Sequence, residues 1–160
     1  MATVGVVEFQ IGGSLYALDI HLAQEIVEMM PITPLPRAPS YLEGIMNLRG
    51  EITSIVNLSQ MLGLSVHDRT EGQKIIVLAP EASGGSNVGI IVDDVHSVIQ
   101  VTESDIEQMD DMASGSAHMK GIIKLKGSDG LDKDKKEDKN LIIWIDIQKI
   151  LGDMMLSQIM

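Results

Sequence analysis

The sequence of 160 residues predicts a mainly β protein, built as small barrels or as a sandwich. Three observations predict this fold class. Short apolar segments rich in Val and Ile recur along the chain, and turn residues separate them. Two short blocks of the first half return in the same order in the second half. The regular alternation of strands with long helices, which is typical of parallel α/β folds, does not appear in the pattern.

The first half is expected to begin with a β-hairpin. Val4–Ile11 and Leu15–Ile20 are apolar segments on either side of the turn dipeptide Gly12-Gly13. The spacing of apolar residues within His21–Met30 favours a short helix that leads into an extended segment. Prolines exclude regular helix from Pro31 to Pro39. Two strands and one helical turn complete this half, at Ile45–Leu48, Ile52–Val56 and Leu58–Leu62.

The second half is expected to contain strands at Lys74–Ala79, Val88–Val92, Val95–Val101, Ile122–Leu125 and Leu141–Ile145. Thr102 is a candidate cap for a turn that runs to Ile106, because Asp105 stands at the third helical position. Asp146 is a candidate N-cap for a final helix. The apolar residues of that helix fall on one face, namely Ile147, Ile150, Leu151 and Met154.

Two repeated blocks indicate an internal duplication. Gly44–Gly50 resembles Gly121–Gly127, which lies 77 residues later, and Asn57–Gly63 resembles Asp146–Gly152, which lies 89 residues later. The difference of 12 residues equals the length of Ser128–Lys139, an almost wholly polar insert. We therefore expect two related β lobes, the second with an enlarged loop. The alternative is that short strings of this kind coincide by chance.

The charge balance argues against nucleic acid as a partner. The chain has 23 Asp and Glu against 12 Lys and Arg, a formal net charge of −11, and its aromatic residues are one Trp, two Tyr and one Phe. Nucleic-acid binding depends on basic side chains that neutralise phosphates and on aromatic faces that stack on bases. Anionic membrane surfaces are disfavoured for the same reason. A protein or a small molecule remains as the expected partner.

The sequence also favours a cytoplasmic location. It has no Cys, which excludes disulfides and thiolate sites. Its first residues, Met1–Glu8, lack the basic n-region of a signal peptide. No run of about 18 uncharged apolar residues is present to cross a bilayer. We therefore expect a soluble protein that does not insert directly into a membrane.

Motifs for catalysis or cofactor binding are absent from the sequence. It contains no phosphate-binding P-loop, dinucleotide-binding fingerprint, nucleophile elbow or zinc-protease motif. Its four histidines are widely separated and lack the spacing of metal ligands. In the insert, Lys136 and Glu137 stand where a calcium loop needs an oxygen ligand and a glycine. The acidic tract Asp93–Asp111 is interpreted as a solvated face rather than as paired catalytic carboxylates. We expect no enzymatic activity, no cofactor and no metal.

Arg49 is the most prominent single candidate for a functional residue. It stands at a predicted strand–turn corner before Gly50, and Arg37 is the only other basic residue up to position 68. A guanidinium in this position can pair with a carboxylate inside the protein or present its donors to a partner. The residues leave both alternatives open.

An ordered set of motifs resembles the CheW-type chemotaxis coupling proteins. The most specific motif is Tyr41–Gly50, which reads Y-L-E-G-I-M-N-L-R-G and contains the pattern G-I-x-N-L-R-G. The others are Tyr16–Ile20, Gln24–Ile26, Leu35–Pro39, Asn57-Leu58, Val88–Val95, Gly121–Gly127 and Leu141–Leu151. The resemblance extends from about Val4 to Leu151.

This resemblance implies two intertwined five-stranded SH3-like β-barrels with a few short helices and a C-terminal helix. It implies one CheW-like domain over residues 1–160, with subdomain 1 at about 15–70 and subdomain 2 at about 71–152. The N-terminal strand is then free to pack across the two. A charged loop insert at 128–139 and a C-terminal tail at 153–160 complete the expected organisation.

The resemblance also implies a function. Proteins of this family are non-enzymatic adaptors, without cofactors, that bridge the cytoplasmic tip of chemoreceptors (methyl-accepting chemotaxis proteins) and the regulatory domain of the histidine kinase CheA. They are cytoplasmic and join membrane receptor arrays through these partners. The receptor-side positions fall here on Ala23, Glu25, Ile26, Arg49 and Val98. The kinase-side positions fall on Leu35, Tyr41 and Gly44. Two alternatives remain: a small β-barrel that binds a ligand or catalyses a reaction, and a regulatory module of another signalling complex.

Overall fold

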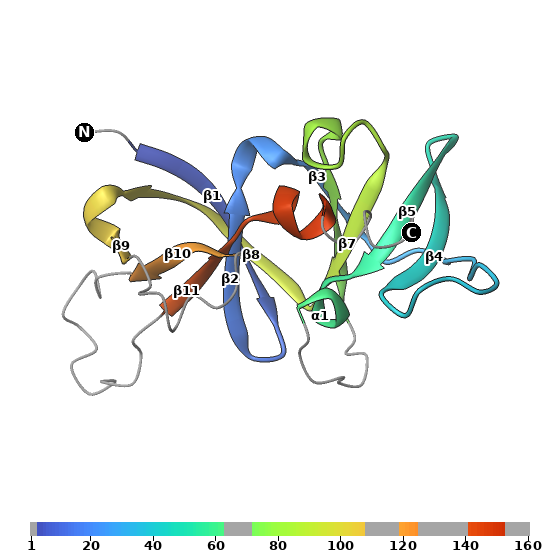
Figure 1. Ribbon diagram of the computed structural model, residues 1–160, viewed down its shortest axis with the longest axis horizontal. Helices are drawn as coiled ribbons and strands as arrows, with labels where there is room; N and C mark the ends of the chain where they lie inside the picture. The colour runs from blue at the N-terminus through green and yellow to red at the C-terminus, as the bar shows by residue number, and fades with distance from the viewer. Residues whose placement is uncertain (1–2, 63–71, 108–118, 125–140, 153–160) are drawn as a thin grey trace.

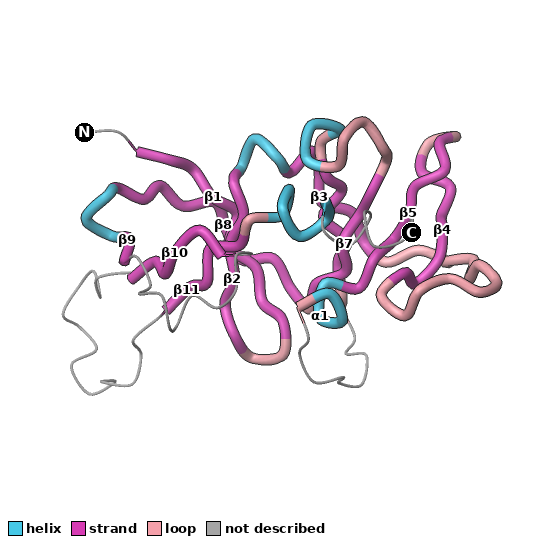
Figure 2. Tube along the Cα trace, viewed as in Figure 1, coloured by secondary structure: helices cyan, strands magenta, loops and turns pink. Residues whose placement is uncertain are grey.

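The computed structural model of the chain describes residues 3–62, 72–107, 119–124 and 141–152. Over these ranges the chain forms two β-sheets and a few short helical segments, so the predicted mainly β fold is confirmed (Figures 1 and 2). The six-stranded sheet lies on the left of Figure 1 and the five-stranded sheet on the right. The helix at residues 147–152 lies between them in this view.

The six-stranded sheet has the order β8-β1-β2-β11-β10-β9. Its strands are β1 (Thr3–Ile11), β2 (Ser14–Asp19), β8 (Asp94–Thr102), β9 (Ile106–Glu107), β10 (Met119–Lys124) and β11 (Leu141–Ile145). All neighbouring pairs are antiparallel except β2 and β11, which run parallel. The predicted hairpin around Gly12-Gly13 is confirmed as β1 and β2.

The five-stranded sheet has the order β3-β6-β7-β5-β4. Its strands are β3 (Ala23–Glu28), β4 (Leu42–Leu48), β5 (Glu51–Asn57), β6 (Lys74–Leu78) and β7 (Val88–Val92). Here β5 and β7 form the parallel pair, and the other neighbours are antiparallel. An isolated bridge between Thr33 and Ile45 brings the segment that follows β3 to the opposite edge strand, β4.

The two sheets share one strand pattern. In each sheet, an edge strand (β8 or β3) pairs with the first strand of a hairpin (β1 or β6). The second strand of that hairpin (β2 or β7) runs parallel to its next neighbour (β11 or β5). This neighbour in turn pairs with β10 or β4. Each hairpin lies in the sheet formed mostly by the other half of the chain. This exchange interleaves the halves and supports the duplication that the repeated blocks indicate. Both sheets take strands from either side of residue 70, and the division into subdomains at 15–70 and 71–152 stays a prediction.

The largest apolar core cluster joins the two sheets. Phe9 and Leu18 enter it from the six-stranded sheet, Ile76 and Ile90 enter from the five-stranded sheet, and Ile147 enters from the C-terminal helix. All five side chains are fully buried. Burial of an aliphatic or aromatic side chain contributes about 1.5–3 kcal/mol, so this shared cluster binds the sheets into one folded unit.

The short helix predicted at the start of His21–Met30 is confirmed only as one 3-10 turn, η1 (Ile20–Leu22), and the expected extended segment begins already at Ala23 as strand β3. A helix that continues to Ile26 and Val27 is therefore wrong. The backbone of β3 pairs with β6 over its whole length, and its residues alternate between half-buried and exposed. The apolar positions in this segment fit a helical period and not a strict strand alternation, and the pairing with β6 overrides this local pattern.

The predicted helix caps are confirmed where the structure describes them. The Asp146 side chain accepts a hydrogen bond from Lys149 N at 3.1 Å, at the start of the helix at residues 147–152. Thr102 and Asp105 form a capping box on the short helix η3 (Glu103–Asp105). The predicted turn after β5 is α1 (Leu58–Met61), with Asn57 as N-cap. Gly63, the insert at 128–139 and the tail at 153–160 lie outside the described residues.

A buried carboxylate ties the first hairpin to strands from the second half. Asp19 on β2 is 6% exposed and accepts hydrogen bonds from Trp144 Nε1 at 2.7 Å and from Lys120 Nζ at 3.1 Å. The Lys120 ammonium also lies 5.3 Å from the centroid of the Trp144 ring, within the range of a cation–π contact. These contacts cross the parallel seam where β2 meets β11.

We expect Asp19→Asn to lower the free energy of unfolding by about 1–2 kcal/mol, because the amide loses a charge-assisted hydrogen bond to Lys120. Urea unfolding followed by the fluorescence of Trp144 measures this change. Glu107→Gln is the matched control, since the Glu107–Lys124 pair is more than half exposed and should contribute well under about 1 kcal/mol. Equal effects of the two substitutions would contradict a stabilising role for the buried carboxylate.

Candidate functional site

The β4–β5 turn holds Arg49 in a backbone conformation that is uncommon for its residue type. Arg49 has φ 53° and Gly50 has φ 86°, and Leu48 pairs with Glu51 around them. Positive φ at both central residues is what a two-residue type I′ hairpin turn requires, and Asn-Gly is the usual choice. The turn is supported by Gly50 N, which donates to Asn47 Oδ1 at 2.8 Å. The hairpin therefore projects Arg49 from its tip.

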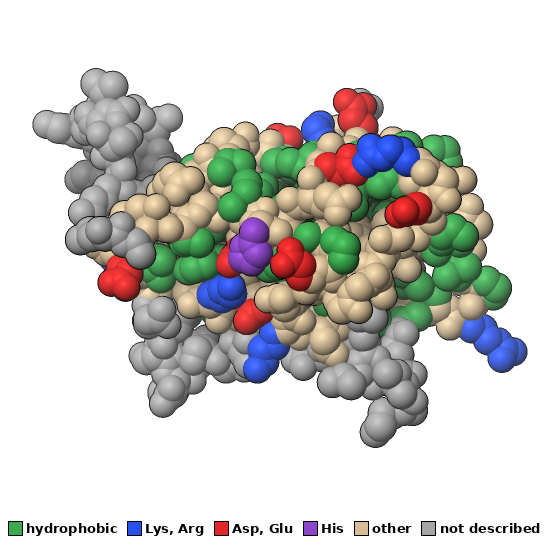
Figure 3. Space-filling view, turned by 90° about the horizontal axis from the view of Figure 1, so that it is seen from above, with side chains coloured by type: hydrophobic (Ala, Val, Ile, Leu, Met, Phe, Trp, Pro, Cys, Tyr) green, Lys and Arg blue, Asp and Glu red, His purple; other side chains and the backbone are tan. Residues whose placement is uncertain are grey.

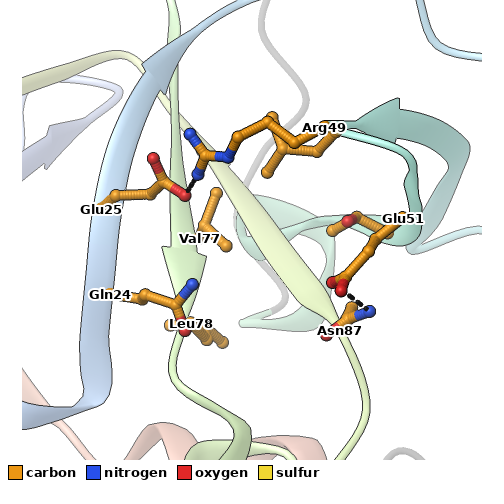
Figure 4. Close-up of a pocket in the computed structure, with 9 residues that line it drawn as sticks. Gln24, Glu25, Arg49, Glu51, Val77, Leu78 and Asn87 are labelled. Atoms are coloured by element: carbon orange, nitrogen blue, oxygen red, sulfur yellow. Dashed lines mark hydrogen bonds and ion pairs between the residues drawn. The ribbon is translucent and has the colours of Figure 1, made fainter.

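Arg49 forms an ion pair with Glu25 on strand β3 (Figure 4). The Glu25 side chain is 24% exposed and the Arg49 side chain is 65% exposed. Of the two alternatives that the sequence left open, the structure shows the internal pair, yet most of the guanidinium remains accessible. Since β3 is an edge strand and Arg49 belongs to the hairpin at the opposite edge of the same sheet, the pair links the two edges.

The Glu25 carboxylate owes its position to a β-bulge. The register between β3 and β6 shifts between Ala23 and Glu25, so that Gln24 is the additional residue. A bulge bends the strand and re-aims its side chains. The Glu25 side chain extends toward Arg49 of the β4–β5 turn, and the Gln24 side chain extends toward Leu78 of β6 (Figure 4).

The ion pair borders a polar hollow in the five-stranded sheet (Figure 4). The hollow has a volume of about 230 Å³. It is lined by Gln24, Glu25, Leu48, Arg49, Glu51, Thr53, Val77, Leu78 and Asn87. Sites for drug-sized ligands usually have volumes of about 300–1,000 Å³, so this hollow suits a single side chain better than a metabolite.

Sequence reasoning missed four polar residues of this hollow: Gln24, Glu51, Thr53 and Asn87. Asn87 Nδ2 donates to Glu51 Oε1 at 3.3 Å, and Asn87 O accepts from Ser54 N at 3.0 Å. Glu51 directly follows the Arg49-Gly50 turn, so its position next to Arg49 in the sequence could have identified it as a candidate site residue. Asn87 comes from the loop before β7, and nothing in the sequence places that loop beside β5.

The structure brings two of the predicted receptor-side residues together and leaves the others apart. Glu25 and Arg49 line the hollow. Ile26 is exposed on β3 next to Glu25 but does not line it, and the half-buried Ala23 packs against the largest core cluster. Val98 is exposed on β8, the edge strand of the other sheet.

Of the predicted kinase-side residues, Leu35 is an exposed apolar side chain. Tyr41 is half-buried against the core, and its carbonyl accepts from Asn57 N at 2.7 Å. Gly44 is buried on β4 beside Thr33. Tyr41 and Gly44 therefore have structural roles whatever else they contact.

The hollow offers charge and hydrogen bonds rather than catalytic chemistry. No cluster of three or more candidate metal ligands occurs among the described residues. Burial raises the pKa of the Tyr16 phenol above 10.0, and this residue belongs to the core cluster and does not line the hollow. Charged side chains are scattered over the face seen in Figure 3, among apolar and uncharged ones. Within the described ranges, no helix is long and apolar enough to span a bilayer.

We expect Arg49→Asn to raise the free energy of unfolding by about 0.5–1 kcal/mol. A left-handed conformation costs an ordinary residue about 1–2 kcal/mol, whereas Asn tolerates it, and an exposed ion pair returns about 0–1 kcal/mol. The midpoint of urea unfolding measures the change. If the free energy of unfolding instead fell by more than about 1 kcal/mol, the ion pair with Glu25 would contribute more than the backbone strain costs.

A family model described as a CheW-like domain matches residues 5–154. The chain is 28% identical over 153 residues to a chemotaxis protein CheW of Thermotoga maritima, covering 96% of this chain and 91% of that protein. It is 30% identical over 159 residues to a chemotaxis protein CheW of Treponema pallidum, covering 96% and 85%. The crystal structure of a scaffolding protein, TtCheW from Thermoanaerobacter tengcongensis, matches with a TM-score of 0.73 at 31% identity, over 90% of this chain and 89% of that one.

Proposed function

The chain belongs to the CheW-like family of scaffold and adaptor proteins, which are not enzymes, and on that premise we propose that it couples chemoreceptors to the histidine kinase CheA. As a member of this family the chain is a chemotaxis coupling adaptor, and CheA and the chemoreceptors are its proposed partners. The adaptor would work in the cytoplasm and reach the membrane through the receptors.

The observation that supports this proposal best is the exposed Arg49–Glu25 pair beside the hollow. These residues occupy two of the positions that the resemblance gives to receptor binding, and they lie together on one sheet. A guanidinium that is 65% exposed keeps donors for charge-assisted hydrogen bonds to a partner. Such contacts, beside the exposed Ile26, suit a receptor helix with both polar and apolar side chains.

We also infer that each sheet forms one of the two five-stranded barrels of the family fold, with the two-residue strand β9 as an addition to the six-stranded sheet. The bridge between Thr33 and Ile45 supports this, because it joins the chain leaving one edge strand to the other edge strand. Leu35 lies two residues from that bridge, on the exposed side of the loop that closes the sheet. It is the strongest of the three candidates for contact with the kinase.

A pull-down tests the kinase partner directly. The tagged chain is immobilised and incubated with CheA, and the bound fraction is measured. We expect CheA, and its isolated regulatory domain, to be retained in a saturable manner. Failure to retain either one, with a folded chain on the resin, would contradict the proposed partnership.

Two matched substitutions separate the proposed surfaces. Leu35→Asp is expected to weaken capture of CheA and to leave receptor binding unchanged, because it puts a charge into an apolar contact on one surface. Val98→Asp is expected to do the reverse. Both replace an exposed apolar side chain with Asp, so each is the control for the other. If both variants lose the same partner, the assignment of the two surfaces is wrong.

A further inference from the structure

We propose that the hollow beside Arg49 is a side-chain pocket that accepts one basic side chain, Lys or Arg, from the tip of the receptor. This inference rests on the proposed function and assigns a chemistry to its docking site. It gives Glu51, Thr53 and Asn87 a role in selecting the partner.

The charges of the lining favour a cation. Three ionisable side chains line the hollow: Glu25, Arg49 and Glu51. The positive charge of Arg49 is balanced by the carboxylate of Glu25, with which it forms an ion pair. The carboxylate of Glu51 receives one hydrogen bond, from the neutral amide of Asn87, and no basic partner of Glu51 occurs among the described residues. One negative charge is therefore uncompensated, and a single ammonium or guanidinium would balance it.

An acidic occupant fits less well. It would meet one guanidinium, already shared with Glu25, and two carboxylates. Like charges brought together at an interface cost several kcal/mol and reject the wrong partner. The same lining thus attracts a basic side chain and discriminates against an acidic one.

Polar acceptors in the lining are compatible with such an occupant. Thr53 is 2% exposed and lines the hollow together with Gln24, Glu51 and Asn87. A basic side chain carries several N–H donors that suit acceptors of this kind.

The shape of the site agrees with this chemistry. Leu48 of β4, which is half-buried, and the almost fully buried Val77 and Leu78 of β6 form the small apolar part of the lining. Lys and Arg have apolar stems and charged heads, so their stems can lie along such residues while the head reaches the carboxylate. The volume of about 230 Å³ accommodates one side chain and not a helix, so the helix itself would rest on the rim.

A double-mutant cycle tests the proposal. The probe is the cytoplasmic fragment of a chemoreceptor, with each Lys and Arg of its tip replaced by Gln in turn. We expect Glu51→Gln to weaken binding about fivefold and one tip substitution to weaken it by the same factor. The double variant should bind no more weakly than either single variant, because both remove one contact. Thr53→Val, which keeps the shape and removes the hydroxyl, should weaken binding in the same direction.

Glu107→Gln is the matched control, because it neutralises an exposed carboxylate on the other sheet, and it should leave binding unchanged. The pocket assignment is overturned if Glu51→Gln binds like the parent chain, or if no tip substitution is coupled to it. In either case the parent chain would still bind the fragment, and the proposed function would stand. If the parent chain itself does not bind, the proposed function and this inference fail together.

Discussion

Arg49→Glu is expected to lower the affinity for chemoreceptors at least tenfold and to leave the chain folded. A tenfold loss corresponds to about 1.4 kcal/mol of binding free energy. The substitution removes a guanidinium that is 65% exposed and breaks the pair with Glu25. It also places three carboxylates around one hollow, at positions 25, 49 and 51. Their mutual repulsion should push the β4–β5 turn away from β3 and separate the two edges of the docking surface, and this loss of geometry should outweigh the added attraction of the hollow for a basic side chain.

Co-sedimentation with receptor-bearing membranes measures this effect, and circular dichroism verifies the fold. Lys124→Glu is the control, since it reverses a charge in an exposed ion pair of the other sheet. Its binding should stay within about twofold of the parent chain, because exposed pairs contribute little. A folded Arg49→Glu variant that sediments like the parent chain would remove Arg49 from the receptor surface.

Gly44→Ala is expected to be the most destabilising single-methyl substitution that we consider, with a loss of about 2–5 kcal/mol in the free energy of unfolding. Gly44 has φ 148°, a conformation that side chains rarely adopt. A Cβ at this position would lie 2.3 Å from the backbone oxygen of Thr33. That oxygen belongs to the bridge with Ile45 and cannot move away cheaply. The bridge between the segment that contains Thr33 and strand β4 should therefore be lost.

Thermal or urea unfolding measures this loss, and Gly13→Ala provides the matched control. Gly13 has φ 92°, but a Cβ there would meet no atom within 4 Å. The control should therefore show the backbone strain of about 1–2 kcal/mol without the steric clash. Equal losses for the two variants would mean that the contact with Thr33 does not limit the fold. Gly44 would then be free for the role in kinase binding that the resemblance implies.

The positions of the strands along the chain followed from the sequence wherever a local signal was present. The turn glycines at positions 12 and 13, the capping residues Thr102 and Asp146, and the apolar segments around them predicted elements that the structure confirms. The segment His21–Met30 was expected to begin with a short helix because its apolar residues have a helical spacing. The neighbour that selects the strand, β6, lies about fifty residues further along the chain.

The candidate site was likewise predictable only where a local signal in the sequence marked a residue. Arg49 could be identified from its position before Gly50 and from the family motif, and Glu25 came from the resemblance. Their ion pair could not be derived, because it depends on a bulge at Gln24 and on two sheet edges approaching each other. Asn87 and Thr53 reach the hollow through long-range pairing. Single-sequence patterns carry no information on pairing of this kind.

The exchange of hairpins between the halves was likewise visible only in the structure. The repeated blocks indicated two related lobes, but they cover parts of β4 and β10, the helix α1 and the helix at residues 147–152, and they leave out the hairpins β1–β2 and β6–β7. These hairpins are the elements that cross over. A duplicated chain that shares its strands in this way buries one common core, which explains why Phe9 and Ile76 lie in the same cluster.

The most direct test of the central claim, that this chain is the coupling adaptor between receptor and kinase, is a three-component sedimentation experiment. Membranes that carry chemoreceptors are mixed with CheA at a fixed concentration, and the chain is added in increasing amounts. Coupling predicts that the CheA found in the pellet rises with the chain and saturates, and that Arg49→Glu shifts this rise to higher concentration. The claim is contradicted if the folded chain leaves the amount of sedimented CheA unchanged at every concentration.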